Sequence, residues 1–211
     1  MCGTSKNQKN KVAILWFKRD LRIWDHAPLI AAAAEGAVLP IYIVEPEFWS
    51  LPDASIRHWA FVSECLHDLQ GALAKLGQPL LIRQGEAVKV LSNLAQAYRF
   101  TSLFSHEGTG NGWTFARDQK VRLWCREQGI VWYELAQHGV QRGSVSRDGW
   151  SRAWDKQMAE PLCSTPNLTP ITTTDLGAIP KEKELSLSPG PCPERQPVHQ
   201  EGINAAGRQR H

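Results

Sequence analysis

The chain lacks the features that mark membrane-spanning, secreted and disulfide-stabilised proteins. No apolar run in its 211 residues approaches the ~18 residues that would suggest a membrane span. The polar start, Met1 to Lys11, has no apolar stretch typical of a secretory signal, so we expect a cytosolic protein. The five cysteines are scattered and never form a CxxC pair, which favours free thiols over a zinc site or a disulfide framework.

The chain also lacks a strong excess of charge and the common phosphate and zinc motifs. Its net charge of +3 is too small to indicate a nucleic-acid partner, because phosphate binding needs a concentrated basic face. No GxxxxGKS/T loop and no HExxH motif occurs, so ATP hydrolysis by the usual route and zinc-peptidase chemistry have no support. His58, His67 and His138 have no second ligand at metal-like spacing, and we predict no metal site.

Aromatic residues are absent from the last 57 positions, so this part cannot build a core of its own. All nine tryptophans, six phenylalanines and three tyrosines lie at or before Trp154. Eight of the 13 prolines lie at or after Pro161, where missing amide donors and fixed φ angles oppose helix and sheet. We therefore predict a disordered N-terminus (1–10), an α/β domain (11–140), a short helical extension (141–160) and a proline-rich linker or disordered tail (161–211).

Short apolar runs alternate with segments of helical period inside the predicted domain. The runs predict buried strands at 12–17, 38–44, 80–82, 102–104 and 130–133. The segments between them predict helices from a cap at Asp25 to Gly36, over 56–77, over 88–98 and from about 114 to 128, with a short helix between 147 and 159. Parallel strands need such crossovers, so the pattern predicts a doubly wound, Rossmann-like α/β fold: a five-stranded parallel sheet in the order 3-2-1-4-5.

Two loops of this sheet are candidates for a ligand site. Ligands of doubly wound sheets bind beyond the carboxyl ends of the strands, where the strand order reverses, here between the first and fourth strands. The loop 18–25 holds three cations and two carboxylates in eight residues, and the loop 106–112 holds three glycines in five positions. The Gly-x-Gly pattern is a weak match to a dinucleotide fingerprint, because Trp113 occupies the place of the third glycine.

The sequence LWFKRDLR at 15–22, followed by Asp25 and Leu29, resembles the WFRRDLRxxDN-AL opening of DNA photolyases and cryptochromes. The resemblance continues through the strand at 38–46, the LAKLG segment at 73–77, the turn at 83–85 and the segments 116–118 and 129–130, so that it covers about residues 11 to 160. It implies the N-terminal α/β domain of that family. In many members this domain carries an antenna chromophore, a folate or a deazaflavin, at its boundary with the next domain.

The resemblance also implies what this chain lacks. Family members place FAD, the DNA-binding surface and the electron-transfer tryptophans in a helical C-terminal domain, and this chain ends where that domain would begin. Light-dependent repair of pyrimidine dimers, a carbon–carbon lyase activity, and blue-light sensing are therefore expected of the full-length family, and antenna binding alone of this chain. The alternatives are a nucleotide-binding or protein-interaction module without photochemistry, and an inactive fragment.

The antenna-binding hypothesis assigns six residues to the cofactor site. Glu107 lies in the loop where folate-binding members carry an acidic residue that accepts hydrogen bonds from a pterin ring, although His106 replaces the usual neighbouring asparagine. Glycines in the same loop would let the backbone approach a ligand closely. The six predicted residues are Phe17, Arg19, Asp20, Glu107, Gly108 and Gly110.

The charged loop also has a purely structural interpretation. Arg19 and Arg22 would then pair with Asp20 and Asp25 to hold the turn from strand to helix. Each such exposed pair contributes at most about 1 kcal/mol.

Overall fold

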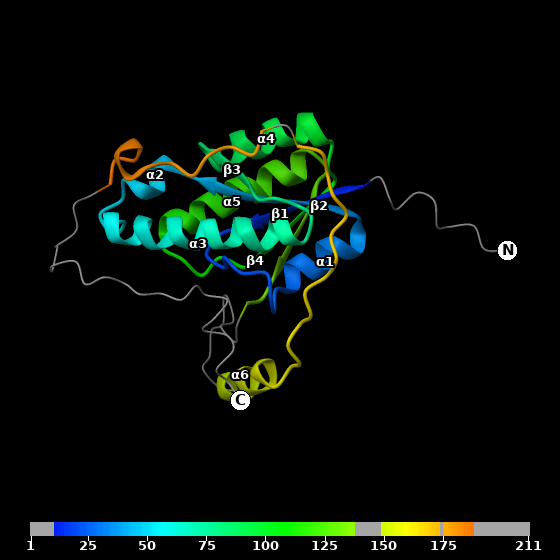
Figure 1. Cartoon of the computed structure of the whole chain (residues 1–211). Coiled ribbons are helices and arrows are strands. Elements are labelled where there is room, and N and C mark those ends of the chain that lie inside the picture. Colours follow the sequence, from blue (N-terminus) through cyan, green and yellow to red (C-terminus); the bar gives the residue numbers. More distant parts are fainter. Residues whose placement is uncertain (1–10, 138–148, 174, 188–211) are drawn as a thin grey trace.

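The predicted sheet is confirmed (Figure 1). The computed structural model describes residues 11–137, 149–173 and 175–187, so the predictions for 1–10 and 188–211 lie outside the described residues. All four strand pairs are parallel, and the strand order is β3-β2-β1-β4-β5. The strands are β1 (Val12–Phe17), β2 (Ala37–Val44), β3 (Leu81–Gln84), β4 (Ser102–His106) and β5 (Val131–Leu135).

Four longer helices connect the strands as predicted, and one short helix was not predicted. They are α1 (Ala27–Glu35), α3 (Ile56–Lys75), α4 (Ala87–Tyr98) and α5 (Gly112–Glu127), while α6 (Trp150–Met158) follows the sheet. The unpredicted helix, α2 (Pro46–Trp49), has four residues, too few to show a period of 3.6.

The predicted cap of α1 was wrong by one residue. His26, not Asp25, caps the helix, because its Nδ1 accepts a hydrogen bond from the backbone N–H of Leu29. Asp25 has a positive φ of 46°, and its carboxylate accepts instead from the backbone N–H of Cys163. The loop after β1 is therefore tied to a segment 138 residues further along the chain.

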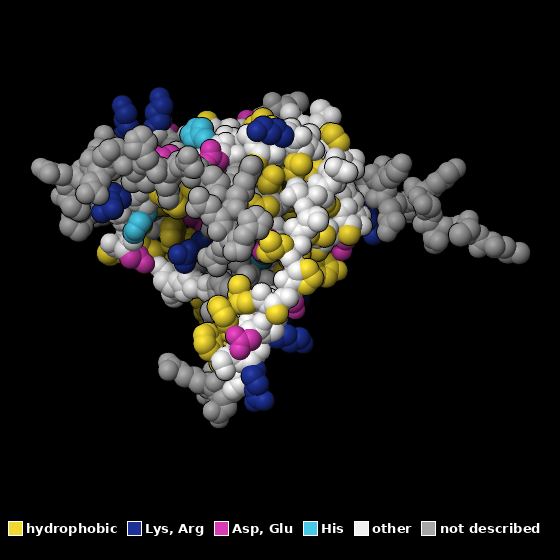
Figure 2. Space-filling view, turned by 60° about the horizontal axis from the view of Figure 1, so that its bottom comes forward, with side chains coloured by type: hydrophobic (Ala, Val, Ile, Leu, Met, Phe, Trp, Pro, Cys, Tyr) yellow, Lys and Arg dark blue, Asp and Glu magenta, His cyan; other side chains and the backbone are white. Residues whose placement is uncertain are grey.

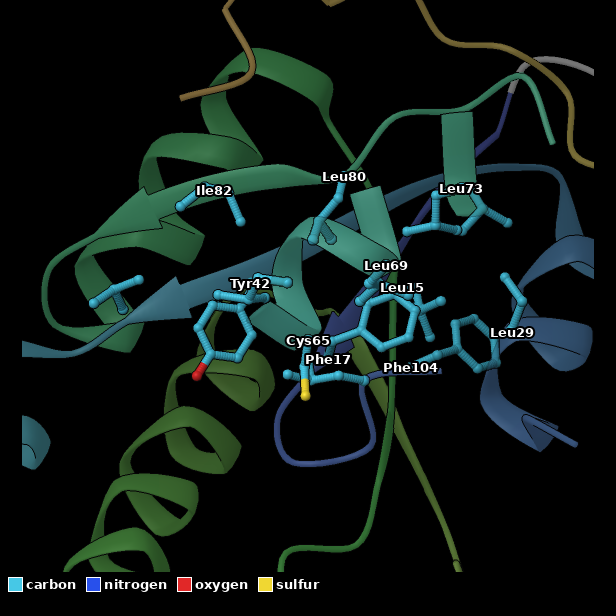
Figure 3. Packing of buried hydrophobic residues seen from close by; sticks show 14 of the residues in the cluster. Leu15, Phe17, Leu29, Tyr42, Cys65, Leu69, Leu73, Leu80, Ile82 and Phe104 are labelled. Carbon is cyan, nitrogen blue, oxygen red and sulfur yellow. The ribbon is translucent and has the colours of Figure 1, made fainter. Parts of the chain in front are cut away.

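Alternate residues of β1 build two cores, one on each face of the sheet. Leu15 and Phe17 face α1 and α3, where Figure 3 shows them packed against leucines of the long helix α3. Ile14 and Trp16 face α4 and α5. Burial of each such side chain stabilises the fold by about 1.5–3 kcal/mol, so we expect a polar residue at any of these positions to be destabilising.

Residues 161–173 and 175–187 form an extended strap along the domain, which includes one turn of 3-10 helix at Glu182–Glu184 (Figure 1). The strap is packed against the domain: Leu168 and Leu185 are buried in the core on the α3 face. Ile82 in β3 donates its backbone N–H to the carbonyl of Leu176 at 2.8 Å. A few aliphatic side chains are thus enough to seat a segment that has no aromatic residues.

Gly177 fits the strap against β3, and a Cβ there should loosen it. Its φ is +71°, and an added Cβ would lie 2.1 Å from the carbonyl oxygen of Ile82. We expect Gly177→Ala to lower the free energy of unfolding by about 1–3 kcal/mol and to speed tryptic cleavage after Lys181 and Lys183. Gly129→Ala is the control, because Gly129 has a φ of +66° with open space around it. Equal costs at the two glycines would contradict a steric role for Gly177.

The helix α6 carries an exposed apolar face. Trp150, Trp154 and Met158 recur every fourth residue, as predicted, and all three side chains are exposed. Figure 2 shows hydrophobic side chains on the projection that holds this helix. None of the helices in the described ranges has the length and apolarity needed to cross a bilayer.

Candidate functional site

The two predicted loops border one cavity of about 560 Å³ at the carboxyl ends of β1, β2 and β4. This volume lies within the range of about 300–1,000 Å³ typical of small-molecule sites. The cavity wall includes all six residues predicted from the sequence: Phe17, Arg19, Asp20, Glu107, Gly108 and Gly110. The structure therefore brings the predicted residues together, while their contact with a chromophore stays a prediction.

Aromatic side chains from α2 and α3 form much of the remaining wall. Phe48 and Trp49 come from α2, and Phe61 comes from α3, where it is 41% exposed. Tyr42 borders the cavity from β2, and burial raises the pKa of its phenol, which is therefore neutral. Flat apolar surfaces beside hydrogen-bonding groups suit planar organic ligands, and the charged residues Arg19, Glu45 and Glu107 border the same cavity.

The cysteine at the cavity is not poised for nucleophilic chemistry. Cys65 lies on α3 and borders the cavity, and burial raises the pKa of its thiol to about 11. Only the thiolate is a strong nucleophile, so this thiol is unreactive near neutral pH. The described cysteines Cys65, Cys125 and Cys163 are free, as predicted.

Asp20 is the centre of a buried hydrogen-bonded cluster with two histidines. One carboxylate oxygen, Oδ2, lies 2.7 Å from Nε2 of His26 and 2.5 Å from Nδ1 of His106, and the other oxygen accepts the backbone N–H of Lys18 at 3.0 Å. All three side chains of the cluster are buried. Burial disfavours the charged carboxylate, but hydrogen bonds from His106 and His26 outweigh it and hold the pKa of Asp20 well below its ordinary value.

The hydrogen bonds also fix the tautomer of His26. Its Nδ1 accepts from the backbone N–H of Leu29, so the ring proton must be on Nε2, which donates to Asp20. Burial lowers the pKa of His26, which agrees with a neutral ring. His26 therefore has both nitrogens engaged, one in capping α1 and one in orienting Asp20.

The cluster of Asp20, His26 and His106 has the residue types of a metal site, and its ligand atoms lie within 4.8 Å of one another. Its hydrogen bonding opposes that use. His26 would need an unprotonated Nε2 to bind a cation, yet its Nδ1 already accepts a backbone N–H. A metal-bound histidine ordinarily donates its other N–H to an oxygen, so the donor set does not fit a metal as it stands.

A network of ion pairs borders the cavity on the other face of β1. Nζ of Lys18 lies 3.1 Å from Asp118, and Arg117 contacts both Asp118 at 2.8 Å and Glu45 at 2.7 Å. The Lys18 ammonium and the Arg117 guanidinium also lie over the ring of Trp16. Burial lowers the pKa of Lys18, which the carboxylate of Asp118 partly offsets. The side chains are 5–12% exposed, so solvent screens these pairs weakly.

The structural interpretation of the charged loop needs correction. Asp20 contacts histidines and not Arg19, which is exposed, and Asp25 binds a backbone N–H while Arg22 donates to its carbonyl oxygen. Sequence reasoning missed His26 as a partner of Asp20. The available signal was its position directly before an alanine–proline helix start, which is the cap position.

Glu45 gives the site a dependence on pH that can be measured. It directly follows β2 and contacts Arg117, but burial outweighs this cation and raises the pKa of Glu45 from 4.5 to about 7. The folded state then holds a proton that the unfolded chain has already released, so this contribution to stability is complete below pH 4.5 and is lost as the pH rises through about 7. We expect Glu45→Gln to flatten that part of a urea-unfolding profile measured from pH 5 to 8. Glu64→Gln, at an exposed site, should leave the profile unchanged, and an unaltered slope in Glu45→Gln would contradict the argument.

A model of the DNA photolyase family matches residues 13–163, which is more than two thirds of the chain. The chain belongs to the DNA photolyase family. Similar proteins include a cryptochrome DASH of Solanum lycopersicum, 34% identical over 114 residues, and a deoxyribodipyrimidine photo-lyase of Salmonella typhimurium, 36% identical over 97 residues. These matches cover 51% and 43% of this chain. They cover 20% of each relative, so the chain spans about a fifth of the length of these relatives.

Two solved photolyases share the fold. A bacterial class III photolyase from Agrobacterium tumefaciens superposes with a TM-score of 0.66 at 19% identity, over 90% of this chain and 41% of that one. An archaeal photolyase from Sulfolobus tokodaii, solved with two FAD molecules and an implied novel light-harvesting cofactor, superposes with a TM-score of 0.64 at 22% identity. That match covers 80% of this chain and 40% of the archaeal one. The sheet of this chain is thus the N-terminal α/β fold of the photolyases.

Proposed function

We propose that the cavity binds an antenna chromophore, a folate or a deazaflavin. The observation that carries the proposal is a cavity of small-molecule size at the strand-order reversal of a photolyase-family sheet, with a wall that combines aromatic side chains with polar and charged ones. In this proposal the domain absorbs light and passes the energy to a reduced FAD. We assign four roles to a helical domain of the longer family members: FAD binding, DNA contact, dimer repair or blue-light sensing. We place the chain itself in the cytosol.

The six predicted residues take different parts in this proposal. Arg19 is exposed and would contact a ligand at the rim, while Phe17 is fully buried and supports the wall from below. Glu107 would accept hydrogen bonds from the ring, and Gly108 and Gly110 would admit it close to the backbone. Asp20 would act through the histidines that it orients.

Titration of the purified full chain with a folate, a deazaflavin and FAD tests the proposal. We expect a near-ultraviolet or blue absorption band to be retained by the protein, with quenched ligand fluorescence. An adenine nucleotide that binds when no coloured ligand does would overturn the proposal in favour of a nucleotide-binding module. A chain that aggregates and retains nothing would indicate an inactive fragment.

Removal of one aromatic side chain from the wall should weaken chromophore binding. Phe61 borders the cavity and is partly exposed, so Phe61→Ala should cost little folding stability. Loss of its contact with a planar ring should raise the dissociation constant by roughly three- to tenfold. Phe115→Ala is the matched control, because Phe115 is exposed on α5 and does not border the cavity. Equal losses in the two variants would place the ligand elsewhere.

A further inference from the structure

His106 presents one ring nitrogen to the cavity, and the cluster behind it fixes where the ring proton lies. Its Nδ1 lies 2.5 Å from the Asp20 carboxylate, which only accepts hydrogen bonds, so Nδ1 carries a proton. In the neutral ring Nε2 is then an acceptor. His106 is 3% exposed and borders the cavity, and its Nε2 has no hydrogen-bond partner within the described residues.

The neighbouring histidine cannot share this role. Both nitrogens of His26 are engaged, with the Leu29 amide and with Asp20, and the two imidazole rings lie with their centroids 4.5 Å apart. His26 therefore holds Asp20 in place while Asp20 holds His106. His26 is thus the supporting histidine, and His106 is the histidine whose second nitrogen faces the cavity.

We propose that Nε2 of His106 accepts a hydrogen bond from a ring N–H of the ligand, and that the cavity thereby selects heteroaromatic rings that carry an imide or lactam N–H. The inference rests on the proposed function and deepens it. In this arrangement aromatic side chains such as Trp49 and Phe61 contact the faces of the ring, whereas His106 accepts a hydrogen bond at its edge. An asparagine at this position, as in the family pattern, offers a donor and an acceptor, but a histidine held by Asp20 offers the acceptor alone.

Nitrogen NMR of the full chain with ¹⁵N-labelled histidine tests the premise without any ligand. We expect His106 to have its proton on Nδ1 and a free Nε2. His67, whose Nδ1 donates to the carbonyl of Ser63, should show the same tautomer, and the variant His106→Asn should remove the His106 signal alone. His26 should show the opposite tautomer. If the signal of His106 instead reports a proton on Nε2 and none on Nδ1, the proposal is overturned.

Binding of 5-deazalumiflavin and of its N3-methyl derivative tests the hydrogen bond itself. The two rings differ only at the imide N–H, so the methylated ring should bind the wild-type chain about three- to tenfold more weakly, the usual worth of one hydrogen bond. In His106→Phe, which keeps a ring but no acceptor, the two ligands should bind equally. His106→Leu, which also has no acceptor, serves as the second variant if the phenylalanine is not tolerated, and thermal unfolding checks both.

The outcomes separate this inference from the proposed function. Equal binding of both rings to the wild-type chain overturns the role of His106 and leaves chromophore binding intact. A preference that persists in His106→Phe assigns the difference to the bulk of the methyl group, which also overturns the role of His106. Failure of both rings, and of the folate, to bind the wild-type chain overturns both proposals.

Discussion

Replacement of Asp20 by asparagine is expected to lower the free energy of unfolding by about 2–5 kcal/mol, because it removes the buried negative charge and leaves at least one buried donor without an acceptor. The Oδ2 atom receives Nε2–H of His26 and Nδ1–H of His106, and Oδ1 receives the backbone N–H of Lys18, whereas an amide has only one acceptor oxygen, so its NH2 group faces a donor in either orientation. His26 has no alternative tautomer, since its Nδ1 already caps α1. A loss of this size is a large part of the 5–15 kcal/mol that stabilises a typical domain.

Urea unfolding at pH 7 measures this effect, with Arg19→Gln as the control. Arg19 is the neighbour of Asp20 in the same motif but is exposed, so its replacement should change stability by no more than about 0.5 kcal/mol. The lowered pKa of Asp20 determines how its effect depends on pH. Its contribution to the free energy of unfolding is present above the ordinary pKa of 3.8 and is lost as the pH falls toward the pKa in the folded state. The wild type should therefore lose more stability in strong acid than Asp20→Asn does. A cost below about 0.5 kcal/mol for Asp20→Asn would contradict the central position of the carboxylate.

Asp118→Ala should have an effect of similar or larger size, about 3–5 kcal/mol, because it removes a shared partner from two buried cations. Lys18 and Arg117 both contact this carboxylate, and the three side chains are 7%, 12% and 5% exposed. Addition of Lys18→Met to Asp118→Ala should recover part of the loss, since it removes one of the two cations that Asp118 compensated.

An exposed ion pair provides the comparison for this measurement. Asp175 contacts Arg83 at 3.5 Å, but its side chain is 78% exposed. Asp175→Ala should cost no more than about 1 kcal/mol in the same urea series. Similar losses of unfolding free energy in Asp118→Ala and Asp175→Ala would show that solvent screens the network beside the cavity as strongly as it screens a surface ion pair.

The sheet was predictable because its strands are buried on both faces and follow one another with helices between them. Apolar runs such as Val12–Phe17 need no knowledge of their neighbours to be recognised, and the family resemblance supports the strand order. The helix α2 was missed because four residues carry no period. The packing of the strap was missed because its aliphatic residues are sparse and show no pattern of either 2 or 3.6.

The location of the site was also predictable, whereas the side-chain contacts within it were not. Both loops follow strands that meet at the reversal of strand order, so their position could be derived from topology. The partners of Asp20 and Lys18 could not, since His106 lies 86 residues after Asp20 and Asp118 lies 100 residues after Lys18. Such contacts depend on side-chain directions at the ends of strands and helices, which periodicity does not report.

The strap has a consequence for how copies of this chain can associate. An open sheet has two edges at which a further strand can add, and growth at both edges produces fibres. Here the bond from Ile82 to Leu176 engages the β3 edge, while β5 has no paired strand beyond β4 among the described residues, and Val131 and Tyr133 on it are exposed. With one edge engaged, we expect sheet-to-sheet pairing to join two copies and then to stop, so that the strap limits aggregation that propagates.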